Sequence, residues 1–556
     1  MATRTFLHAS AGARALIAGV ALLAALPASG ALAKTAHHRI RPDPRDARIE
    51  ALESEVKSLA DKVETLETVA AQRAAAPAPV AAPPAPVAVA EVKPPPPPAA
   101  PPANPVITAV ANMPAGGASI IAGKPVIQSA DGRFSANLHA IMQFDAASYS
   151  QASAGPIASD FRRGAAAADT AHARDLNSGT DFRRARIGID GKIFGDFEYN
   201  ALFDFAGSGA EDGGHVQELW VQYSALRPWR LKIGAFPPSV GLEDANSTNG
   251  MPFLERPASS DMARSLAGGD FREAAQLYLA TDRWFASGAV STRLVGTINS
   301  TGSSTAQTFD QQVGLLGRVA VVPLQGNGWM LHVGAHGSYV ITPPDVGGPD
   351  VGAGRFPIQM RERPELRVDG TRLIDTGAID AVHASTAGLE LAGQVRSLYV
   401  QGEYERFAIQ RRLSALSNPH FHGWYVEGGW SLTGEQRRYN KTTFAFDAPP
   451  VDHPLDVKDG SFGSLEVVLR YSDSDLNYHA GLAGVATPAD GVRGGEQQIV
   501  AAGLNWYLNP VVRFMLDYQH VKVDRLSPGA ATFSTPVGAQ VGQTYNAVSM
   551  RSQFAF

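Results

Sequence analysis

The chain has 556 residues, including 55 Gly and 38 Pro, and 44% of its residues are hydrophobic. Its 48 Lys and Arg nearly balance 53 Asp and Glu, so the net charge of −5 predicts no strong overall attraction to nucleic acid. Cys is absent, which excludes disulfide frameworks, thiolate metal sites, cysteine nucleophiles and a lipidated N-terminal cysteine.

Residues 1–33 have the pattern of a secretory signal peptide. Arg4 and Arg14 precede an apolar run, and the segment ends in Ala31-Leu32-Ala33, which predicts cleavage before Lys34. The run, at about 12 residues, is shorter than the roughly 20 that a spanning helix needs. No later segment has 18 apolar residues in succession, so any membrane crossing has to use a closed β-barrel.

Two short modules follow in residues 34–130. Residues 34–76 contain a three-heptad apolar seam, which predicts a periplasmic coiled coil that oligomerises; an amphipathic helix packed on its own chain is the alternative. Residues 77–130 form a Pro/Ala-rich linker, with 13 prolines between 77 and 105, which predicts an extended polyproline-type spacer. The seam consists of Ile49, Leu52, Val56, Leu59, Val63, Leu66 and Ala70.

Residues 131–556 show the period-two alternation of β-strands. In 134–144, 184–205 and 512–519 an apolar face alternates with a polar or charged one. A soluble sandwich would bury the apolar face, whereas a membrane barrel turns it toward lipid and the charges toward a wet lumen.

Three features favour the barrel. Aromatic residues cluster at strand ends, as expected for interfacial girdles. Short turns such as 195–196 and 508–510 alternate with long connections, for which we take 151–180, 237–270, 341–357 and 447–460. The chain also ends in a strand whose last residue is Phe556, as outer-membrane barrels do. At roughly 10 residues per strand plus connections, the segment predicts an all-β transmembrane antiparallel barrel of about 16 strands, with 18 as the alternative.

Several segments of this module resemble the phosphate-selective porin O and P family of Gram-negative outer membranes. The resemblance implies a homotrimeric 16-stranded porin in the outer membrane. It also implies a ladder of lumenal Arg leading to a basic constriction, and a third long loop that folds inward. The segments are DFRRARIGIDGKIFGDFEYNALFDFAG (181–207), LKIGAFPPSVGLEDANSTNGMPFLERP (231–257), RPELRVDGTRLIDTGAI (363–379), WSLTGEQRRY (430–439) and GLNWYLNPVVRFMLDYQHV (503–521). The coiled coil and the linker are additions to the simplest family pattern and resemble an N-terminal stalk that reaches into the periplasm toward the cell wall.

The candidate site is a set of pore-lining charges that bind anions. Guanidinium groups suit this role because they bind phosphate oxygens in a bidentate manner and stay protonated. We place Arg183, Arg184 and Arg186 on the constriction wall; solvated loop charges are the alternative for Arg183 and Arg256. The full set is Arg183, Arg184, Arg186, Lys192, Arg256, Arg264, Arg513 and Arg551, with Asp204 as a counter-charge. A second basic run comprises Arg361, Arg363, Arg367 and Arg372, and 237–270 contains no Lys but five acidic residues.

These features predict a porin for passive diffusion of small hydrophilic solutes. We expect it to prefer anions, with phosphate or polyphosphate as the solute. The alternative is an envelope tether that links the outer membrane to the cell wall through the coiled coil. A barrel-embedded enzyme is not favoured, since no G-x-S-x-G, H-E-x-x-H or Walker motif is present. We expect no cofactor, metal or nucleic acid. The expected partners are outer-membrane lipids, inorganic anions, other copies of the chain, the barrel-assembly machinery through Phe556, and the cell wall.

Overall fold

The computed structural model describes residues 117–121, 124–151, 176–206, 214–269, 272–294, 310–347, 354–413, 415–529 and 536–556. The chain divides into two units, Met1–Ala100 and Pro101–Phe556, and every described residue belongs to the second. The predicted signal peptide, the coiled coil and most of the linker therefore lie outside the described residues.

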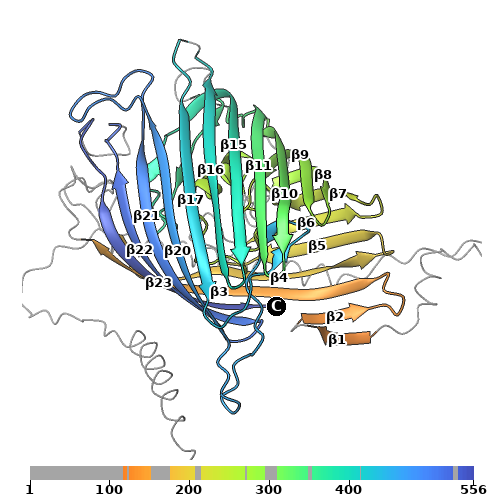
Figure 1. Cartoon of the computed structure of the whole chain (residues 1–556). Helices are drawn as coiled ribbons and strands as arrows, with labels where there is room; N and C mark the ends of the chain where they lie inside the picture. Colours follow the sequence, from red (N-terminus) through yellow and green to blue (C-terminus); the bar gives the residue numbers. More distant parts are fainter. Residues whose placement is uncertain are drawn as a thin grey trace, which may run out of the picture. The chain divides into compact units, whose positions relative to one another are not determined.

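Sixteen antiparallel strands close into one barrel (Figure 1). Each strand pairs with its neighbour along the chain, and β23 returns to pair with β3, where Arg551 lies opposite Asp145. The predicted fold class is therefore confirmed. The strands are β3 (Ser135–Gln151), β4 (Gly179–Ile193), β5 (Phe197–Asp204), β6 (His215–Tyr223), β7 (Trp229–Phe236), β8 (Arg272–Ala280), β9 (Trp284–Leu294), β10 (Val313–Gly326), β11 (Trp329–Thr342), β15 (Ile379–Val395), β16 (Leu398–Arg411), β17 (His420–Ser431), β20 (Ser464–Tyr478), β21 (Val492–Tyr507), β22 (Val512–Asp524) and β23 (Thr544–Ala555).

The strands have their apolar side chains outside and their charged side chains inside. Leu391 is 58% exposed on the outer face, whereas its neighbour Glu390 is 2% exposed in the lumen. Leu469 and Arg470 repeat this contrast on β20, at 62% and 3%. This is the arrangement of a membrane barrel and excludes a soluble sandwich, whose core would hold the leucines. Tryptophans form a girdle at one end of the strands: Trp229, Trp284, Trp329, Trp430 and Trp506.

Short turns gather at that girdle end and long loops at the other. One connection breaks the pattern. We expected 447–460 among the long loops, but it belongs to the 432–463 connection at the short-turn end, which Figure 1 shows at the bottom of the view. The prediction was wrong because the end at which a connection lies depends on the direction of the preceding strand, and β17 runs toward the short turns.

A small hairpin precedes the barrel. β1 (Gly117–Ile121) pairs with β2 (Lys124–Gln128). β2 also pairs antiparallel with the start of β3, where Val126 lies opposite Asn137. These residues fall inside the segment 77–130 that we assigned to the linker, so strand pairing begins before residue 131. The local reason is that GASII and KPVIQ are short apolar stretches free of the proline clusters that precede them.

Among the described residues, three connections fold into the lumen. The inward loop (237–269) carries the helix α4 (Ala258–Leu266), which contacts β15, β16, β17 and β20 on the far wall. The outer lid (354–376) contains β12 (Pro357–Ile358), β13 (Arg361–Glu362) and β14 (Ile374–Asp375). The inner hairpin (437–447) contains β18 (Tyr439–Asn440) and β19 (Ala445–Phe446) and enters from the short-turn end. The buried core therefore lies inside the barrel, between these segments and the wall.

No helix in the described part of the chain is long and apolar enough to cross a membrane.

Candidate functional site

The basic wall of the lumen is formed by β4. A β-bulge at Arg183 breaks the alternation, since Phe182 pairs with Phe144 and Arg184 with Gln143. Both Arg183 and Arg184 therefore point inward, together with Arg186. Arg186 Nε lies 2.7 Å from Asp204 Oδ2, so Asp204 is the counter-charge of this wall. Lys192 lies on the same face of β4 but is exposed at the end of the strand.

Glu255 of the inward loop binds the arginines of the basic wall. Arg183 binds its carboxylate with two hydrogen bonds of 2.6 and 3.1 Å, and Arg551 Nη2 lies 3.1 Å away. Arg184 Nη2 is 3.9 Å from the same carboxylate. Burial opposes ionisation, yet these guanidinium groups hold the pKa of Glu255 well below its usual range. The inward loop is thus fixed to the wall by charge.

The remaining predicted arginines are also occupied by protein groups. Arg551 forms a bidentate pair with Asp145 at 2.7 Å. Arg513 donates to the carbonyl oxygen of Met251, and Arg256 to that of Asn246, which shapes the inward loop from two sides. Arg264 pairs with Asp244 and Asp261 within the loop. The structure therefore brings eight of the nine predicted residues together around the inward loop, and anion binding by them stays a prediction.

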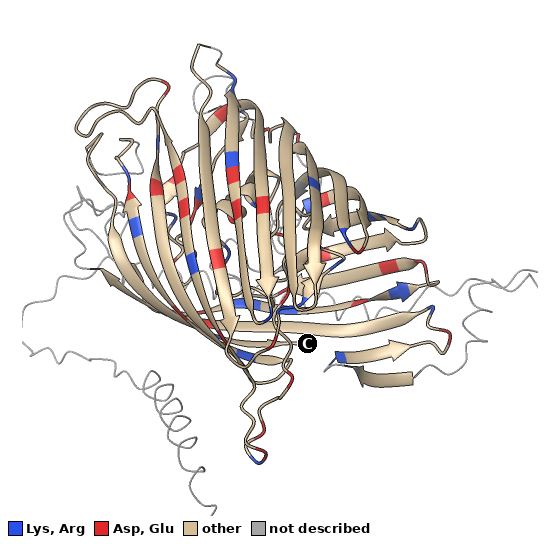
Figure 2. Cartoon of the chain, viewed as in Figure 1, with Lys and Arg blue, Asp and Glu red and all other residues tan. Residues whose placement is uncertain are grey.

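The opposite wall is acidic. Glu403, Glu427 and Glu466 point inward from β16, β17 and β20, and Figure 2 shows acidic positions recurring across these strands. Arg437 of the inner hairpin forms a bidentate pair with Glu466. Arg470 binds Glu427 at 3.0 Å and Glu365 of the outer lid at 2.8 Å. Ion pairs thus fix all three inserted segments to the walls.

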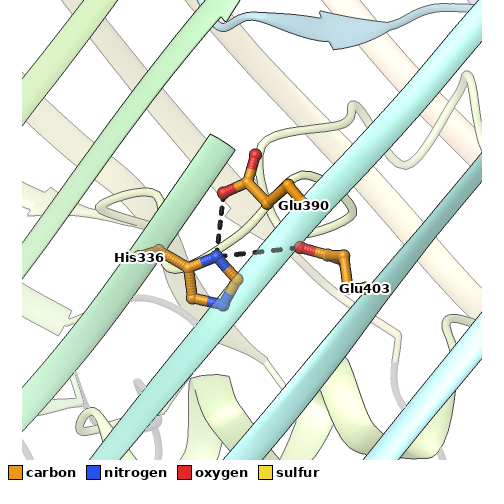
Figure 3. A group of neighbouring side chains, drawn as sticks. All are labelled: His336, Glu390 and Glu403. Atoms are coloured by element: carbon orange, nitrogen blue, oxygen red, sulfur yellow. Dashed lines mark hydrogen bonds and ion pairs between the residues drawn. The ribbon is translucent and has the colours of Figure 1, made fainter. Parts of the chain in front are cut away.

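A cluster on β11, β15 and β16 has the donor atoms for a metal ion. Figure 3 shows His336, Glu390 and Glu403 converging, with His336 Nδ1 at 2.8 Å from Glu390 and 4.0 Å from Glu403. One imidazole and two carboxylates could hold a divalent transition metal. Here, however, Arg318 donates to both oxygens of Glu390, and amides of the inward loop donate to Glu403. These atoms already have partners, and the cluster acts as an ion-pair network in the wall.

The open part of the lumen includes a cavity of about 410 Å³ between the inward loop and the inner hairpin. Five cationic side chains line it, compared with three carboxylates. The cations are Lys124, Arg186, Lys232, Arg256 and Arg264, and the carboxylates are Glu218, Asp244 and Asp447.

Lys232 is the functional candidate that the sequence analysis missed. It lies on β7, with its ammonium group 4.1 Å from the centre of the Trp220 ring, and it makes no ion pair with any described residue. The signal was present in the sequence. In Trp229–Phe236 the residues Leu231 and Ile233 face outward, which places Lys232 in the lumen by alternation.

Comparison with known proteins identifies the architecture. The family model described as phosphate-selective porin O and P matches residues 154–556. The chain belongs to this family. Porin O of Pseudomonas aeruginosa (strain PAO1) is 26% identical over 368 residues, which cover 62% of this chain and 77% of that protein. A protein of Caulobacter vibrioides is 26% identical over 352 residues, which cover 62% of this chain and 63% of that protein.

Solved structures also resemble this porin. The anion-selective porin from Comamonas acidovorans has a TM-score of 0.43 at 13% identity, covering 76% of this chain and 100% of that one. The outer membrane channel DcaP of Acinetobacter baumannii has a TM-score of 0.41 at 10% identity, covering 77% and 99%.

Family membership and the barrel make this protein an outer-membrane porin that forms a channel. The predicted family is confirmed.

Proposed function

We propose that this porin conducts small hydrophilic anions in preference to cations, with phosphate as the leading solute. The observation that carries the proposal is the excess of cations around the cavity, above all Lys232. Most lumenal guanidinium groups are neutralised by carboxylates. Lys232 makes no ion pair with a described residue: its ammonium group lies over the rings of Trp220 and Phe236, and the carboxylates of Glu218 and Glu198 act on it only from beyond ion-pair distance. In a narrow lumen, an unpaired ammonium group attracts anions more strongly than in open water.

The arrangement also suits release. Conduction requires that each site bind weakly enough for the ion to leave, or that several sites share it. Lys124 and Lys232 both line the cavity, so an anion can pass between two point charges without displacing the ion pairs of the inward loop. The family description further supports phosphate as the solute.

The test is the reversal potential of the purified full-length protein in a planar bilayer under a KCl gradient, followed by titration of phosphate against the chloride current. We expect an anion-selective sign and a phosphate block of the current. Lys232→Gln should lower both the selectivity and the block. Lys458→Gln is the control, because Lys458 is exposed in the 432–463 connection. A cation-selective sign in the unmodified protein would refute the proposal.

A further inference from the structure

One short stretch of the inward loop, residues 240–243, turns away from the open part of the lumen. Its neighbours on both sides, Ser239 and Asp244, line the cavity of about 410 Å³. Within the stretch, Leu242 and Glu243 are only 1% and 0% exposed, and Leu242 belongs to an apolar cluster that includes wall residues of β15 and β16. A shift of this stretch away from β16 would therefore narrow the cavity.

Glu403 of β16 holds this stretch through one buried carboxylate. The backbone N–H groups of Leu242 and Glu243 donate to its Oε1 and Oε2 at 2.5 and 3.1 Å. Ser260 of α4 donates to Oε2 at 3.3 Å, and the hydroxyl group of Tyr425 on β17 donates at 2.9 Å. One carboxylate thus accepts four hydrogen bonds from described residues, three of which come from the inward loop.

Gly241 fits closely against the same carboxylate. A Cβ atom on Gly241 would lie 2.5 Å from Glu403 Oε1 and 3.2 Å from His336 Cε1. Both distances are shorter than the roughly 3.5–4.0 Å of normal contact between heavy atoms. Because its hydrogen bonds fix the carboxylate, a side chain at position 241 has to displace either the loop or Glu403.

Loss of the carboxylate would leave the buried N–H groups of Leu242 and Glu243 without acceptors. A buried donor without a partner is costly, since it has lost water and gained nothing in exchange. The stretch lowers this cost by turning its donors toward the open lumen, and it then enters the cavity that its neighbours line.

We propose that Glu403 is a positioning residue of the channel, whose carboxylate keeps the pore open by holding residues 240–243 against β16. Glu403 is not among the residues that line the cavity, so it acts through the loop. The open state does not depend on the sign of the permeating ion, and the proposed anion preference can fail while this role of Glu403 holds.

Single-channel recording of the full-length porin in a planar bilayer tests this role. We expect Glu403→Ala to raise the time spent in closed or lower-conductance levels, relative to the open level, by about tenfold, the equivalent of one buried donor left without an acceptor. Glu403→Gln keeps one acceptor oxygen and should give a smaller increase. Gly241→Ala should also cause closures, because its methyl group displaces the same contact from the loop side.

Glu405→Gln is the matched control. Glu405 lies two residues along the same strand and is 1% exposed, but its carboxylate hydrogen-bonds with His336 Nε2 at 2.7 Å. If Glu403 only supported folding, substitutions at 403 and 405 would both lower the free energy of unfolding in urea and leave closures of the assembled channels unchanged. In the double variant with Gly241→Ala and Glu403→Ala, the two effects should not add, because both act on one contact.

Four results would overturn this role of Glu403: no added closures in Glu403→Ala and Gly241→Ala, equal closures in Glu405→Gln, fully additive effects in the double variant, or a larger open current in Glu403→Ala. If Glu403→Ala does not assemble, Glu403→Gln and Gly241→Ala decide. The sign of the reversal potential, measured on the same channels, reports separately on the proposed anion preference.

Discussion

At the residue scale, Glu255 is the carboxylate on which the lumenal arginines converge. Arg183 and Arg184 of β4 and Arg551 of β23 lie within 3.9 Å of it, and Arg367 lies 3.6 Å away. Glu255→Gln removes the negative charge that these guanidinium groups share and takes from Arg183 its bidentate partner, while Arg551 keeps Asp145 and Arg184 keeps Gln143. We expect higher anion selectivity together with a loss of about 3–5 kcal/mol in stability, as when one partner of a buried ion pair is removed. Reversal potential and urea unfolding measure the two effects. Asp452→Asn, at an exposed position, should change neither, and unchanged selectivity in Glu255→Gln would contradict the prediction.

We expect the stability of the folded protein to depend on pH through Glu362 of the outer lid. Burial and the nearby Asp261 raise its pKa to about 6 from the ordinary 4.5. A carboxyl group whose pKa is raised by folding stabilises the folded state fully below its ordinary pKa and loses that contribution as the pH rises through the folded value. Stability should therefore fall by up to about 2 kcal/mol between pH 4.5 and pH 7 from this group.

Glu362→Gln should remove this part of the pH dependence, which unfolding curves at pH 5 and pH 7.5 would measure. Asp459→Asn, an exposed substitution in the 432–463 connection, serves as the control. An identical pH dependence in wild type and Glu362→Gln would show that the carboxyl group titrates as it does in water.

At the element scale, the inner hairpin narrows the lumen from the short-turn end. Arg437 fixes it to Glu466, and Arg318 donates to the carbonyl oxygens of Thr443 and Phe444 at 2.6 and 2.8 Å. Replacing 438–447 by a short Gly/Ser linker should raise the single-channel conductance, because it removes buried side chains from the lumen. Replacing 453–460, which belongs to the same connection but is exposed, should leave conductance unchanged. Equal conductance in both variants would mean that the hairpin lies outside the conducting path.

At the scale of the whole molecule, the inside-out arrangement can be tested by comparing an exposed apolar residue that faces lipid with one that faces water. Leu391 is 58% exposed on the barrel wall, and Val457 is 86% exposed in the 432–463 connection. Leu391→Arg should cost about 2–4 kcal/mol of folding free energy in a bilayer, because it puts a charge against hydrocarbon. Val457→Arg should be nearly neutral, since Val457 faces water. Urea titration of folding into lipid vesicles would measure both, and equal costs would contradict the inside-out arrangement.

Alternation along the strands predicted the inward direction of Arg184, Arg186, Arg513 and Arg551. Together with the turn pattern, the aromatic strand ends and the length of the segment, it also predicted the barrel and its approximate strand number. The same rule would have found Lys232. These features are local, because successive side chains of a strand point alternately to lipid and to the lumen, and neighbouring residues show this in the sequence.

Only the tertiary structure decided what those charges contact. Glu255 meets Arg183 from 72 residues away, and Asp145 meets Arg551 from 406 residues away. The bulge that turns Arg183 inward depends on the register between β3 and β4, and the end at which 447–460 lies depends on the direction of β17. Barrel closure sets all of these at once, by bringing distant strands around a common lumen, and no local pattern encodes that pairing.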